Sequence, residues 1–441
     1  MTSRWSSPVC ATSVTDDAGS CHWQRWSRAR TGLETVSLAQ VERVFVAPGN
    51  AGTSLEPGVE NLPIAAGDTD GLIHAAQTHR VDLTVVGPEA PLVDGIVDRF
   101  EEAGLACFGP RAGPAQLEGS KSFTKAFLDR HAIPTAAWQA FTDPDAARQY
   151  IEGHDLPLVL KADGLAAGKG VIIATNHQEA LAAVDEILVD QRFGGAGRRL
   201  VIEEFLEGEE ISFICVASGT DVVALATSQD HKAREAGDRG PNTGGMGAYS
   251  PAPRVDAKLH QRIMDEVIHP TVRGLVKEGM PYLGFLYAGL MIDRHGNPRV
   301  LEYNCRFGDP ETQPILMRMQ SDLAALCQAA LSGRLSQFEI DWDARFALGV
   351  VMVADGYPED YPRGDKIRGL DQVRSDAVKV FHAGTRSEAG EVVTDGGRVL
   401  CVTALGETVG AAQRTAYSVV GEIDWKGADW RPDIGWRALH D

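Results

Sequence analysis

Short apolar runs alternate with helical patterns after the first forty residues, and this alternation restricts the fold more than any other feature of the chain. Residues 44–46 and 83–86 predict buried strands, and the segment 69–79 between them has the apolar spacing of a helix. A further helix is predicted over 93–103. Because strand, helix and strand follow one another, we expect a parallel sheet with ligands at the carboxyl ends of its strands, in an α/β domain over 41–116.

Two more structural units follow. A hairpin is predicted where residues 158–161 and 170–173 flank a glycine-rich turn, with helices over 123–131 and 179–189. Further strands are predicted at 200–203, 212–214, 222–226, 348–353, 378–381 and 398–402. The length of 441 residues agrees with about three domains. The expected fold class is α/β and α+β, multidomain: a parallel N-terminal α/β domain (41–116), a central region of two subdomains (117–343) and a small C-terminal α+β domain (344–441).

The charge balance argues against polyanionic partners. The chain has 42 Lys and Arg against 61 Asp and Glu, a net charge of -19, which disfavours general binding to nucleic acid or anionic membranes. No apolar run approaches the ~20 residues that cross a bilayer. Seven scattered cysteines without a C-x-x-C pair fit a reducing compartment. We therefore predict a cytoplasmic protein with no nucleic-acid or membrane partner.

The first forty residues do not continue this pattern. Tryptophans, cysteines, serines and arginines occur there without period, and no strand is predicted, although an α/β sheet that begins at Val44 normally has a strand before it. We predict an atypical segment over 1–40, with the first strand of the N-terminal domain missing. A disordered extension, a transit peptide and a reading-frame or start-site error all remain open, and Asp16 and Asp17 count against the transit peptide.

The segment 299–311 carries the clearest chemical signal. A strand here would place Val300, Glu302 and Asn304 on one face, with the intervening residues on the other. A carboxylate beside a carboxamide suits Mg²⁺, which prefers oxygen ligands and takes waters and nucleotide phosphates as its others. Arg306 adds a fixed cation for a phosphate or carboxylate. A half-buried strand with a solvated polar edge explains the same pattern.

A glycine-rich loop follows the lysine that ends the strand predicted for 158–161. Such a loop lets backbone N–H groups approach phosphates, while Lys161 supplies a point charge. The loop is not a Walker A motif, since three residues rather than four separate Gly164 from Gly168, and Gly170 stands where Ser or Thr would bind Mg²⁺. A glycine-rich hairpin with solvated lysines is the structural alternative.

Two other segments carry polar chemistry. The segment 203–212 could contact an adenine with backbone and apolar groups and leave carboxylates for a ribose, but taken alone it is more simply a solvated acidic loop. The segment 242–251 has more glycines than a β-turn needs, as in a loop that closes on a phosphate or carboxylate. His231, upstream of it, could act as a base, although a lone histidine is more often structural.

In this order the motifs resemble those of the ATP-grasp superfamily and, within it, of the glycinamide ribonucleotide synthetase family. The resemblance covers nearly everything after Val41, and several motifs are too long for chance agreement. It rests on residues 46–53, 86–92, 117–121, 161–171, 240–251, 302–313, 381–385, 396–405 and 433–437.

The resemblance implies a role for each matching residue. ATP would be bound by Lys121, Lys161, Gly168, the adenine hinge Glu203, Phe205 and Leu206, and Glu210 at the ribose, with Glu209 as the alternative. Mg²⁺, or Mn²⁺ in its place, would be bound by Glu302 and Asn304. Arg306 and Lys161 would be catalytic, and substrates would meet Glu89, Asp230, Asn242, Thr243, Gly244, Gly245 and Arg306.

The implied reaction joins glycine to 5-phosphoribosylamine through glycyl phosphate and converts ATP to ADP and phosphate. It needs positioning and charge neutralisation rather than a Ser, Cys or His nucleophile. Another ATP-grasp carboxylate–amine ligase and a non-catalytic nucleotide-binding protein are the alternatives, and the chain is expected to be a monomer or weak oligomer.

The family normally opens with a strand and a glycine-rich loop that help bind the sugar phosphate. Residues 1–40 show neither, which implies a frame error or weakened phosphoribosylamine binding.

Overall fold

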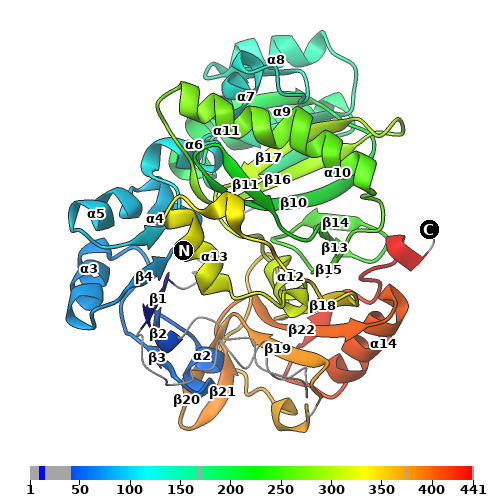
Figure 1. The fold of residues 1–441 in the computed structure, drawn as a ribbon. Coiled ribbons are helices and arrows are strands. Elements are labelled where there is room, and N and C mark those ends of the chain that lie inside the picture. The colour runs from blue at the N-terminus through cyan, green and yellow to red at the C-terminus, as the bar shows by residue number, and fades with distance from the viewer. Residues whose placement is uncertain (1–8, 15–40, 167–169, 374, 440–441) are drawn as a thin grey trace.

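Three parts make up the molecule (Figure 1). The computed structural model describes residues 41–166, 170–373 and 375–439, and the backbone alone of residues 9–14. The N-terminal part (blue) and the C-terminal part (orange to red) are each built on one main sheet, and the central part (cyan to yellow) on two. The predicted α/β and α+β multidomain architecture is confirmed, whereas the limits given for its domains stay predictions.

The N-terminal part is a five-stranded sheet with helices packed against it. Its elements are β2 (Val41–Ala47), α2 (Ala51–Leu55), β3 (Val59–Asn61), α3 (Thr69–Thr78), β4 (Leu83–Val85), α4 (Glu89–Val93), α5 (Ile96–Glu102), β5 (Cys107–Phe108) and α6 (Ala112–Gly119). β2 runs parallel to β3, and β4 to β5, as the strand–helix alternation predicts. The helix predicted over 93–103 is divided at Gly95, whose φ of +86° is a left-handed conformation that glycine tolerates.

The central strand of this sheet comes from the segment in which no strand is predicted. β1 (Val9–Val14) lies between β2 and β4 and pairs antiparallel with both. The prediction that 1–40 contains no strand is therefore wrong at 9–14, and the sheet is mixed rather than parallel. Without β1, the facing edges of β2 and β4 would leave backbone groups unpaired, so even a weakly patterned segment gains by pairing there. The rest of 1–40 lies outside the described residues.

A four-stranded sheet forms the first central subdomain. Its elements are β6 (Trp138–Phe141), α8 (Pro144–Glu152), β7 (Leu158–Ala162), β8 (Val171–Ala174), α9 (His177–Val184) with a π-helical turn (Asp185–Val189), a 3₁₀ turn (Gly194–Arg198) and β9 (Leu200–Glu204). The strand order is β6-β9-β7-β8. The predicted hairpin is confirmed, since Lys161 pairs with Val171 across β7 and β8. Ile151 of α8 and Ala180 of α9 share a buried core with Leu160 of β7.

The second central subdomain is an antiparallel sheet in the order β11-β10-β16-β17. Its elements are α7 (Lys121–Arg130), β10 (Glu209–Ser218), β11 (Asp221–Ala224), α10 (Ala257–Ile263), a π-helical turn (Met264–Ile268), α11 (His269–Lys277), β16 (Leu283–Ile292), β17 (Pro298–Asn304), α12 (Thr312–Arg318) and α13 (Leu323–Leu331). The side chains of β10 enter two separate cores. Phe213 packs in one core with Val272 of α11, and Val216 packs in the other with Leu326 of α13. Burial on both faces explains the continuous apolar run of β10.

A β-bulge at Leu301 changes the face that Val300 occupies. Along β16 the register of β17 passes from Val300 directly to Glu302, so Leu301 has no partner of its own. Val300 is fully buried in the core, whereas Glu302 and Asn304 keep a common, partly exposed face. The prediction that Val300 shares a face with the two polar residues is therefore wrong, because the bulge interrupts the alternation.

The C-terminal sheet includes two strands from the central part of the sequence. The elements of this region are β12 (Gln229–Asp230), β13 (Ala233–Glu235), β14 (Arg239–Asn242), β15 (Gly247–Ser250), β18 (Phe346–Val353), β19 (Val378–His382), β20 (Thr385–Glu388), β21 (Glu391–Thr394), β22 (Arg398–Gly406), α14 (Val409–Val420), β23 (Asp429–Trp430) and 3₁₀ turns at Leu370–Gln372 and Arg437–Leu439. The 3₁₀ turn at Leu335–Gln337 packs instead in the core of the second central subdomain. The main sheet has the order β12-β15-β18-β22-β19. Because β15 pairs with β18, the C-terminal sheet supports the loops on either side of β15.

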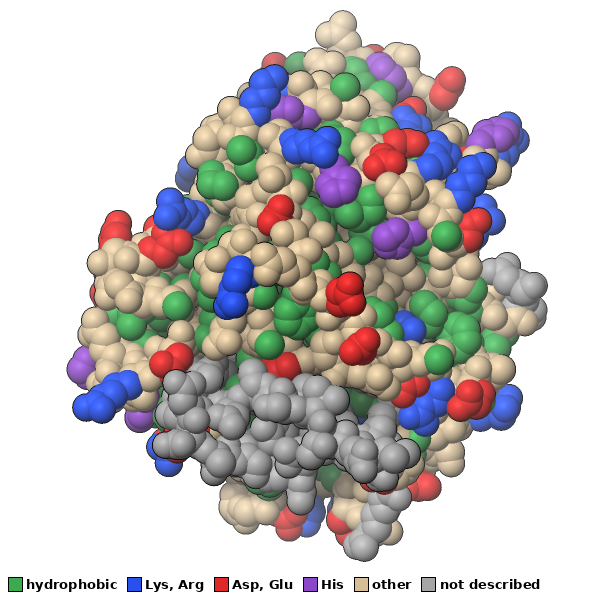
Figure 2. Space-filling model, in the orientation of Figure 1, with side chains coloured by type: hydrophobic (Ala, Val, Ile, Leu, Met, Phe, Trp, Pro, Cys, Tyr) green, Lys and Arg blue, Asp and Glu red, His purple; other side chains and the backbone are tan. Residues whose placement is uncertain are grey.

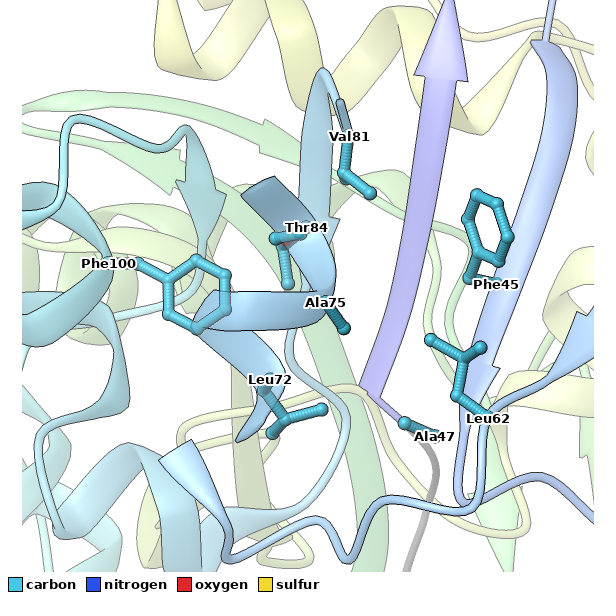
Figure 3. A pocket seen from close by; sticks show the side chains of 9 residues that line it. Phe45, Ala47, Leu62, Leu72, Ala75, Val81, Thr84 and Phe100 are labelled. Carbon is cyan, nitrogen blue, oxygen red and sulfur yellow. The ribbon is translucent and has the colours of Figure 1, made fainter. Parts of the chain in front are cut away.

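An apolar cavity in the N-terminal part lies apart from the predicted site (Figure 3). Its described lining contains none of the predicted site residues and consists of Phe45, Ala47, Leu62, Leu72, Ala75, Ala76, Val81, Thr84 and Phe100. Acidic and basic side chains are interspersed over the face shown in Figure 2. Within the described ranges, no helix has the length and apolar character that spanning a membrane requires.

Candidate active site

Two lysines share one buried carboxylate where the central subdomains meet. Nζ of Lys161, at the end of β7, lies 2.8 Å from Oε1 of Glu203, and Nζ of Lys125, on α7, lies 2.7 Å from Oε2. All three side chains are almost fully buried. Lys161 also donates to the carbonyl oxygen of Leu301 at 3.2 Å. Glu203 therefore fixes Lys161 between the sheet of the first subdomain and strand β17 of the second.

The turn between β9 and β10 is the predicted adenine hinge. The carboxylate of Glu203 at its start is engaged by the two lysines, so any contact between this residue and an adenine would use its backbone. Leu206 is buried, whereas Phe205 is 38% exposed. The turn thus presents one apolar side chain to the outside, and its role in binding adenine stays a prediction.

Lys121 lies at the base of the glycine-rich loop. Its Nζ donates to the carbonyl oxygen of Gly164 at 3.1 Å, and burial lowers its pKa. Asp163, next to Gly164, accepts hydrogen bonds from the backbone N–H and hydroxyl of Ser122. The structure therefore brings Lys121 and the loop together, while Gly168 lies outside the described residues.

Lys232 lies between Glu210, the predicted ribose ligand, and Glu302, a predicted metal ligand. Its ammonium pairs with Glu210 and lies 3.3 Å from Oε1 of Glu302. The charge of Lys232 lowers the pKa of Glu302 to about 2, against the opposing effect of burial. Glu209 points elsewhere, since it accepts from Nε2 of Gln229 at 2.9 Å. This arrangement favours Glu210 over Glu209 as the ribose ligand, an assignment that stays a prediction.

Glu302 and Asn304 fit a divalent metal ion. They project from the same face of β17 and offer an ionised carboxylate and a carboxamide oxygen, both hard ligands. No group of three or more His, Cys, Asp or Glu side chains forms a metal site in the part of the chain that the structure describes. The other ligands would have to be phosphate oxygens and waters, which is the usual arrangement for Mg²⁺.

Arg306 connects the central and N-terminal parts. Its Nε lies 3.3 Å from Glu89 on α4, and its Nη2 lies 3.3 Å from Glu118 on α6. Glu118 also accepts the backbone N–H of Cys305 at 2.7 Å. Burial raises the pKa of Glu118 to about 7, against the opposing charge of Arg306. Arg306 and Glu89, both predicted to meet substrates, are therefore in contact, and the guanidinium is held from two sides.

Asp230 and the loop 242–245 lie on the side of the site that the C-terminal sheet supports. Asp230 ends β12 and is 7% exposed, and burial raises its pKa against the opposing charge of Lys232. The hydroxyl of Thr243 donates to the carbonyl oxygen of Lys232 at 2.8 Å and accepts the N–H of Gly245 at 3.0 Å. The loop is therefore tied to the segment between β12 and β13 that carries Lys232.

His231 is a structural residue. It is fully buried, and its Nε2 accepts the N–H of Gly435 at 3.2 Å. Burial lowers the pKa of His231 to about 3, so the ring is neutral at physiological pH. The ring links the strand end at Asp230 to the C-terminal part, in agreement with the structural interpretation of a lone histidine.

Three charged residues of the site were not predicted from the sequence. Lys125 lies one helical turn after Lys121, and this spacing places both on one helix face, so a comparison along α7 could have found it. Lys232 and Glu118 gain their partners only through tertiary structure. No local pattern in the sequence signals either contact.

The two central subdomains direct lysines toward a strand that carries a carboxylate and a carboxamide, which defines the chain as an ATP-grasp enzyme. ATP binding and the use of a divalent metal ion are general to this fold. Three phosphoribosylglycinamide synthetase family descriptions match the chain: the N domain over residues 33–118, the ATP-grasp (A) domain over 119–312 and the C domain over 347–437. The chain belongs to the phosphoribosylglycinamide synthetase family, and the family predicted from the motifs is confirmed.

Similar proteins match almost end to end. The phosphoribosylamine–glycine ligase of Allochromatium vinosum is 60% identical over 426 residues, 97% of this chain and 98% of that protein. The ligase of Yersinia pestis is 57% identical over 427 residues, with the same coverage. The crystal structure of phosphoribosylamine–glycine ligase from Thermotoga maritima has a TM-score of 0.78 at 33% identity, covering 95% of this chain and 98% of that one. The biotin carboxylase domain of a Hydrogenobacter thermophilus 2-oxoglutarate carboxylase shares the fold alone, with a TM-score of 0.67 at 16% identity over 86% and 83% of the chains.

Proposed function

We propose that this chain ligates glycine to 5-phosphoribosylamine with ATP, giving glycinamide ribonucleotide, ADP and phosphate in purine biosynthesis. The observation that carries the proposal is the full-length match to phosphoribosylamine–glycine ligases, in a chain that retains the charged and polar groups of the site. Lys121, Lys161, Glu302, Asn304 and Arg306 are all present, and the four charged ones are each held by a polar contact to a neighbouring residue.

The ATP side of the reaction depends on charge neutralisation. Lys161 approaches the phosphates from β7 of the first subdomain, Lys121 from the start of α7, and Lys232 from the segment after β12. A Mg²⁺ ion held by Glu302 and Asn304, or Mn²⁺ in its place, would supply further positive charge beside the phosphates. Phosphoryl transfer needs little covalent help from a protein beyond such positioning and charge. Lysines already fixed by ion pairs need no reorganisation as the negative charge moves.

The carboxylate side of the reaction takes place near Arg306. A glycine carboxylate oxygen attacks the γ-phosphorus, ADP leaves, and glycyl phosphate forms. The amine of phosphoribosylamine then attacks the acyl carbon, a C–N bond forms, phosphate leaves, and the amine proton passes to solvent. Arg306, held by Glu89 and Glu118, is placed to stabilise negative charge on the acyl phosphate. The loop 242–245 would shield this hydrolysable intermediate from water.

Phosphoribosylamine binding depends on the N-terminal part. The carboxyl ends of β2 and β4 lie at one edge of the sheet, the edge that presents Glu89 to Arg306, and α/β sheets bind ligands at that edge. β1 runs in the opposite direction, so its carboxyl end lies at the other edge. This supports the prediction that the sugar phosphate is bound more weakly than in a sheet whose central strand is parallel.

ADP release from the full chain tests the proposal. The assay contains Mg·ATP and glycine, with or without phosphoribosylamine generated from ribose 5-phosphate and ammonia. We expect ADP release that requires both substrates, with glycinamide ribonucleotide identified by mass spectrometry. Release with glycine and a different amine, but not with phosphoribosylamine, would favour another carboxylate–amine ligase. Absence of turnover in folded protein that still binds ATP would favour the non-catalytic alternative.

The metal, assembly and location belong to the same proposal. Removing divalent ions with a chelator should stop ADP release, and adding back Mg²⁺ or Mn²⁺ should restore it. Sedimentation at micromolar concentration should give a monomer or a weakly associating species. Fluorescence microscopy of the tagged chain in its own cells should place it in the cytoplasm.

A further inference from the structure

We infer that Arg398, in the C-terminal part, is a positioning residue for the active site. Its guanidinium holds the Gly244–Gly245 turn against Asp309, three residues after Arg306 in the chain. The inference rests on the proposed function for its kinetic consequences, whereas its structural consequence can be measured independently of activity.

The guanidinium of Arg398 bridges two segments of the site. Arg398 begins β22 and is 7% exposed. Its Nη1 donates to the carbonyl oxygens of Gly244 and of Asp309, the latter at 3.1 Å. Its Nη2 donates to Oδ2 of Asp309 at 3.0 Å. One planar cation thus satisfies acceptors from the glycine turn and from the segment after Arg306, a geometry that a lysine ammonium cannot reproduce.

The turn is packed too closely for a side chain. A Cβ on Gly244 would lie 2.9 Å from Cζ of Arg398, and a Cβ on Gly245 would overlap Pro310. Gly245 also has a φ of +110°, a backbone conformation that residues with a side chain rarely adopt. The glycines therefore serve close approach to Arg398 and to the Asp309–Pro310 segment, which explains the glycine-rich pattern of this loop without requiring free movement.

A tyrosine of the C-terminal part holds the same turn. The hydroxyl of Tyr357 accepts the backbone N–H of Gly244 at 3.1 Å. The carbonyl oxygen of Tyr357 accepts from Nε of Arg234 at 2.9 Å. The amide and the carbonyl of Gly244 are thus both bound by side chains of the C-terminal part, from Tyr357 and Arg398.

Arg398 affects the carboxylate side of the site and not the ATP side. Lys161 and Lys121 are fixed by Glu203 and by the glycine-rich loop of the first subdomain, whereas the guanidinium of Arg398 donates to Gly244 and Asp309. Asp309 follows Arg306 by three residues and acts on it electrostatically, and the turn is part of the loop 242–245. Loss of the guanidinium should therefore misplace the groups that meet glycine and its acyl phosphate. A misplacement of about 1 Å can lower turnover by on the order of 100-fold.

Arg398→Lys and Arg398→Met test the inference, with Arg386→Met as the matched control. Arg386 lies on β20 of the same part, and its side chain is 40% exposed. We expect both Arg398 variants to bind Mg·ATP within about twofold of the native affinity by calorimetry, and to lose on the order of 100-fold in kcat/KM for glycine. The control should keep native values. A kcat/KM for glycine within threefold of native, or a parallel loss of ATP affinity, would overturn the inference.

Hydrogen–deuterium exchange separates this inference from the reaction itself. We expect the Gly244 and Gly245 amides to exchange at least tenfold faster in Arg398→Lys than in the native chain, whether or not the native chain turns over. If the Arg398 variants do not fold, Tyr357→Phe removes one hydroxyl from the same turn and should also speed exchange at Gly244. Unchanged exchange in folded Arg398→Lys, or in Tyr357→Phe where the arginine variants fail to fold, would contradict the positioning role.

Discussion

Nζ of Lys232 lies 3.3 Å from Oε1 of Glu302, and the same ammonium pairs with Glu210. The carboxylates predicted for the metal ion and for the ribose are therefore held together by one cation. Lys232 is carried by the chain that leaves β12, a strand of the C-terminal sheet. The ATP site consequently depends on a segment of the ATP-grasp region that is anchored in the C-terminal sheet.

Lys232→Met should lower ATP-dependent turnover by roughly 10²- to 10³-fold, because it removes a preorganised charge beside the phosphates. Lys232→Arg should keep part of the activity, since the charge remains in a different geometry. Steady-state kinetics with saturating glycine measures both. Lys258→Met, at an exposed lysine on α10, is the control and should behave as the native chain. Activity of Lys232→Met within threefold of native would show that this cation has no part in the reaction.

Glu203→Gln should destabilise the fold and weaken ATP binding together. The substitution leaves Lys125 and Lys161 buried with no carboxylate between them. Removing one partner of a buried ion pair costs about 3–5 kcal/mol in the free energy of unfolding. Urea unfolding and calorimetric titration with Mg·ATP measure the two effects.

The control for this change is Glu207→Gln, at an exposed position on the adjoining turn. It should alter the free energy of unfolding by less than about 0.5 kcal/mol. If Glu203→Gln is as stable as this control, the carboxylate does not hold the lysines in solution.

Glu89→Gln should weaken the use of phosphoribosylamine without affecting ATP. The Glu89 carboxylate holds Arg306 from the N-terminal side at 3.3 Å, and the neutral amide removes the charge that orients the guanidinium. We expect kcat/KM for phosphoribosylamine to fall on the order of 10-fold, with the Kd of Mg·ATP unchanged. Asp94→Asn, an exposed carboxylate at the end of α4, is the control. An equal loss in the control would assign the effect to net charge.

Features of the site that local sequence encodes could be predicted. Alternation along β17 identified the face shared by Glu302 and Asn304, and glycines beside a strand-end lysine identified the loop after Lys161. These signals are local because side-chain direction and glycine tolerance are properties of a few consecutive residues. The bulge at Leu301 was missed because it depends on the register with β16.

Features that join distant segments could not be predicted. The ion pairs of Lys232 and Arg306 have partners that the sequence places far away. β12 and β15 precede most of the C-terminal sheet in the chain, yet they belong to it. β1 was overlooked because its six residues show weak alternation, whereas the open position between β2 and β4 that it fills is a tertiary feature.

His382 makes the contact between the N-terminal and C-terminal parts sensitive to pH. Its carbonyl oxygen accepts from Nδ2 of Asn50 at 2.8 Å, and a Cβ on Gly52 would lie 2.5 Å from its ring. Burial, with a smaller contribution from Lys379, lowers the pKa of His382 from the ordinary 6.5 to about 4, against the opposing charge of Glu56. The folded protein therefore keeps this ring neutral over a range in which the unfolded chain protonates it.

Replacing His382 by phenylalanine should flatten the pH dependence of stability. Between pH 6.5 and 4 the unfolded chain binds more protons than the folded one, so the free energy of unfolding falls as the pH falls. From pH 7.5 to pH 5.0 the contribution lost by the native chain is about 2 kcal/mol. His382→Phe keeps a ring against Gly52 and removes the titration, so its stability should fall by about 2 kcal/mol less over the same interval. Urea unfolding at the two pH values, followed by tryptophan fluorescence, measures the difference, and equal losses in both proteins would show that His382 is not the group that responds.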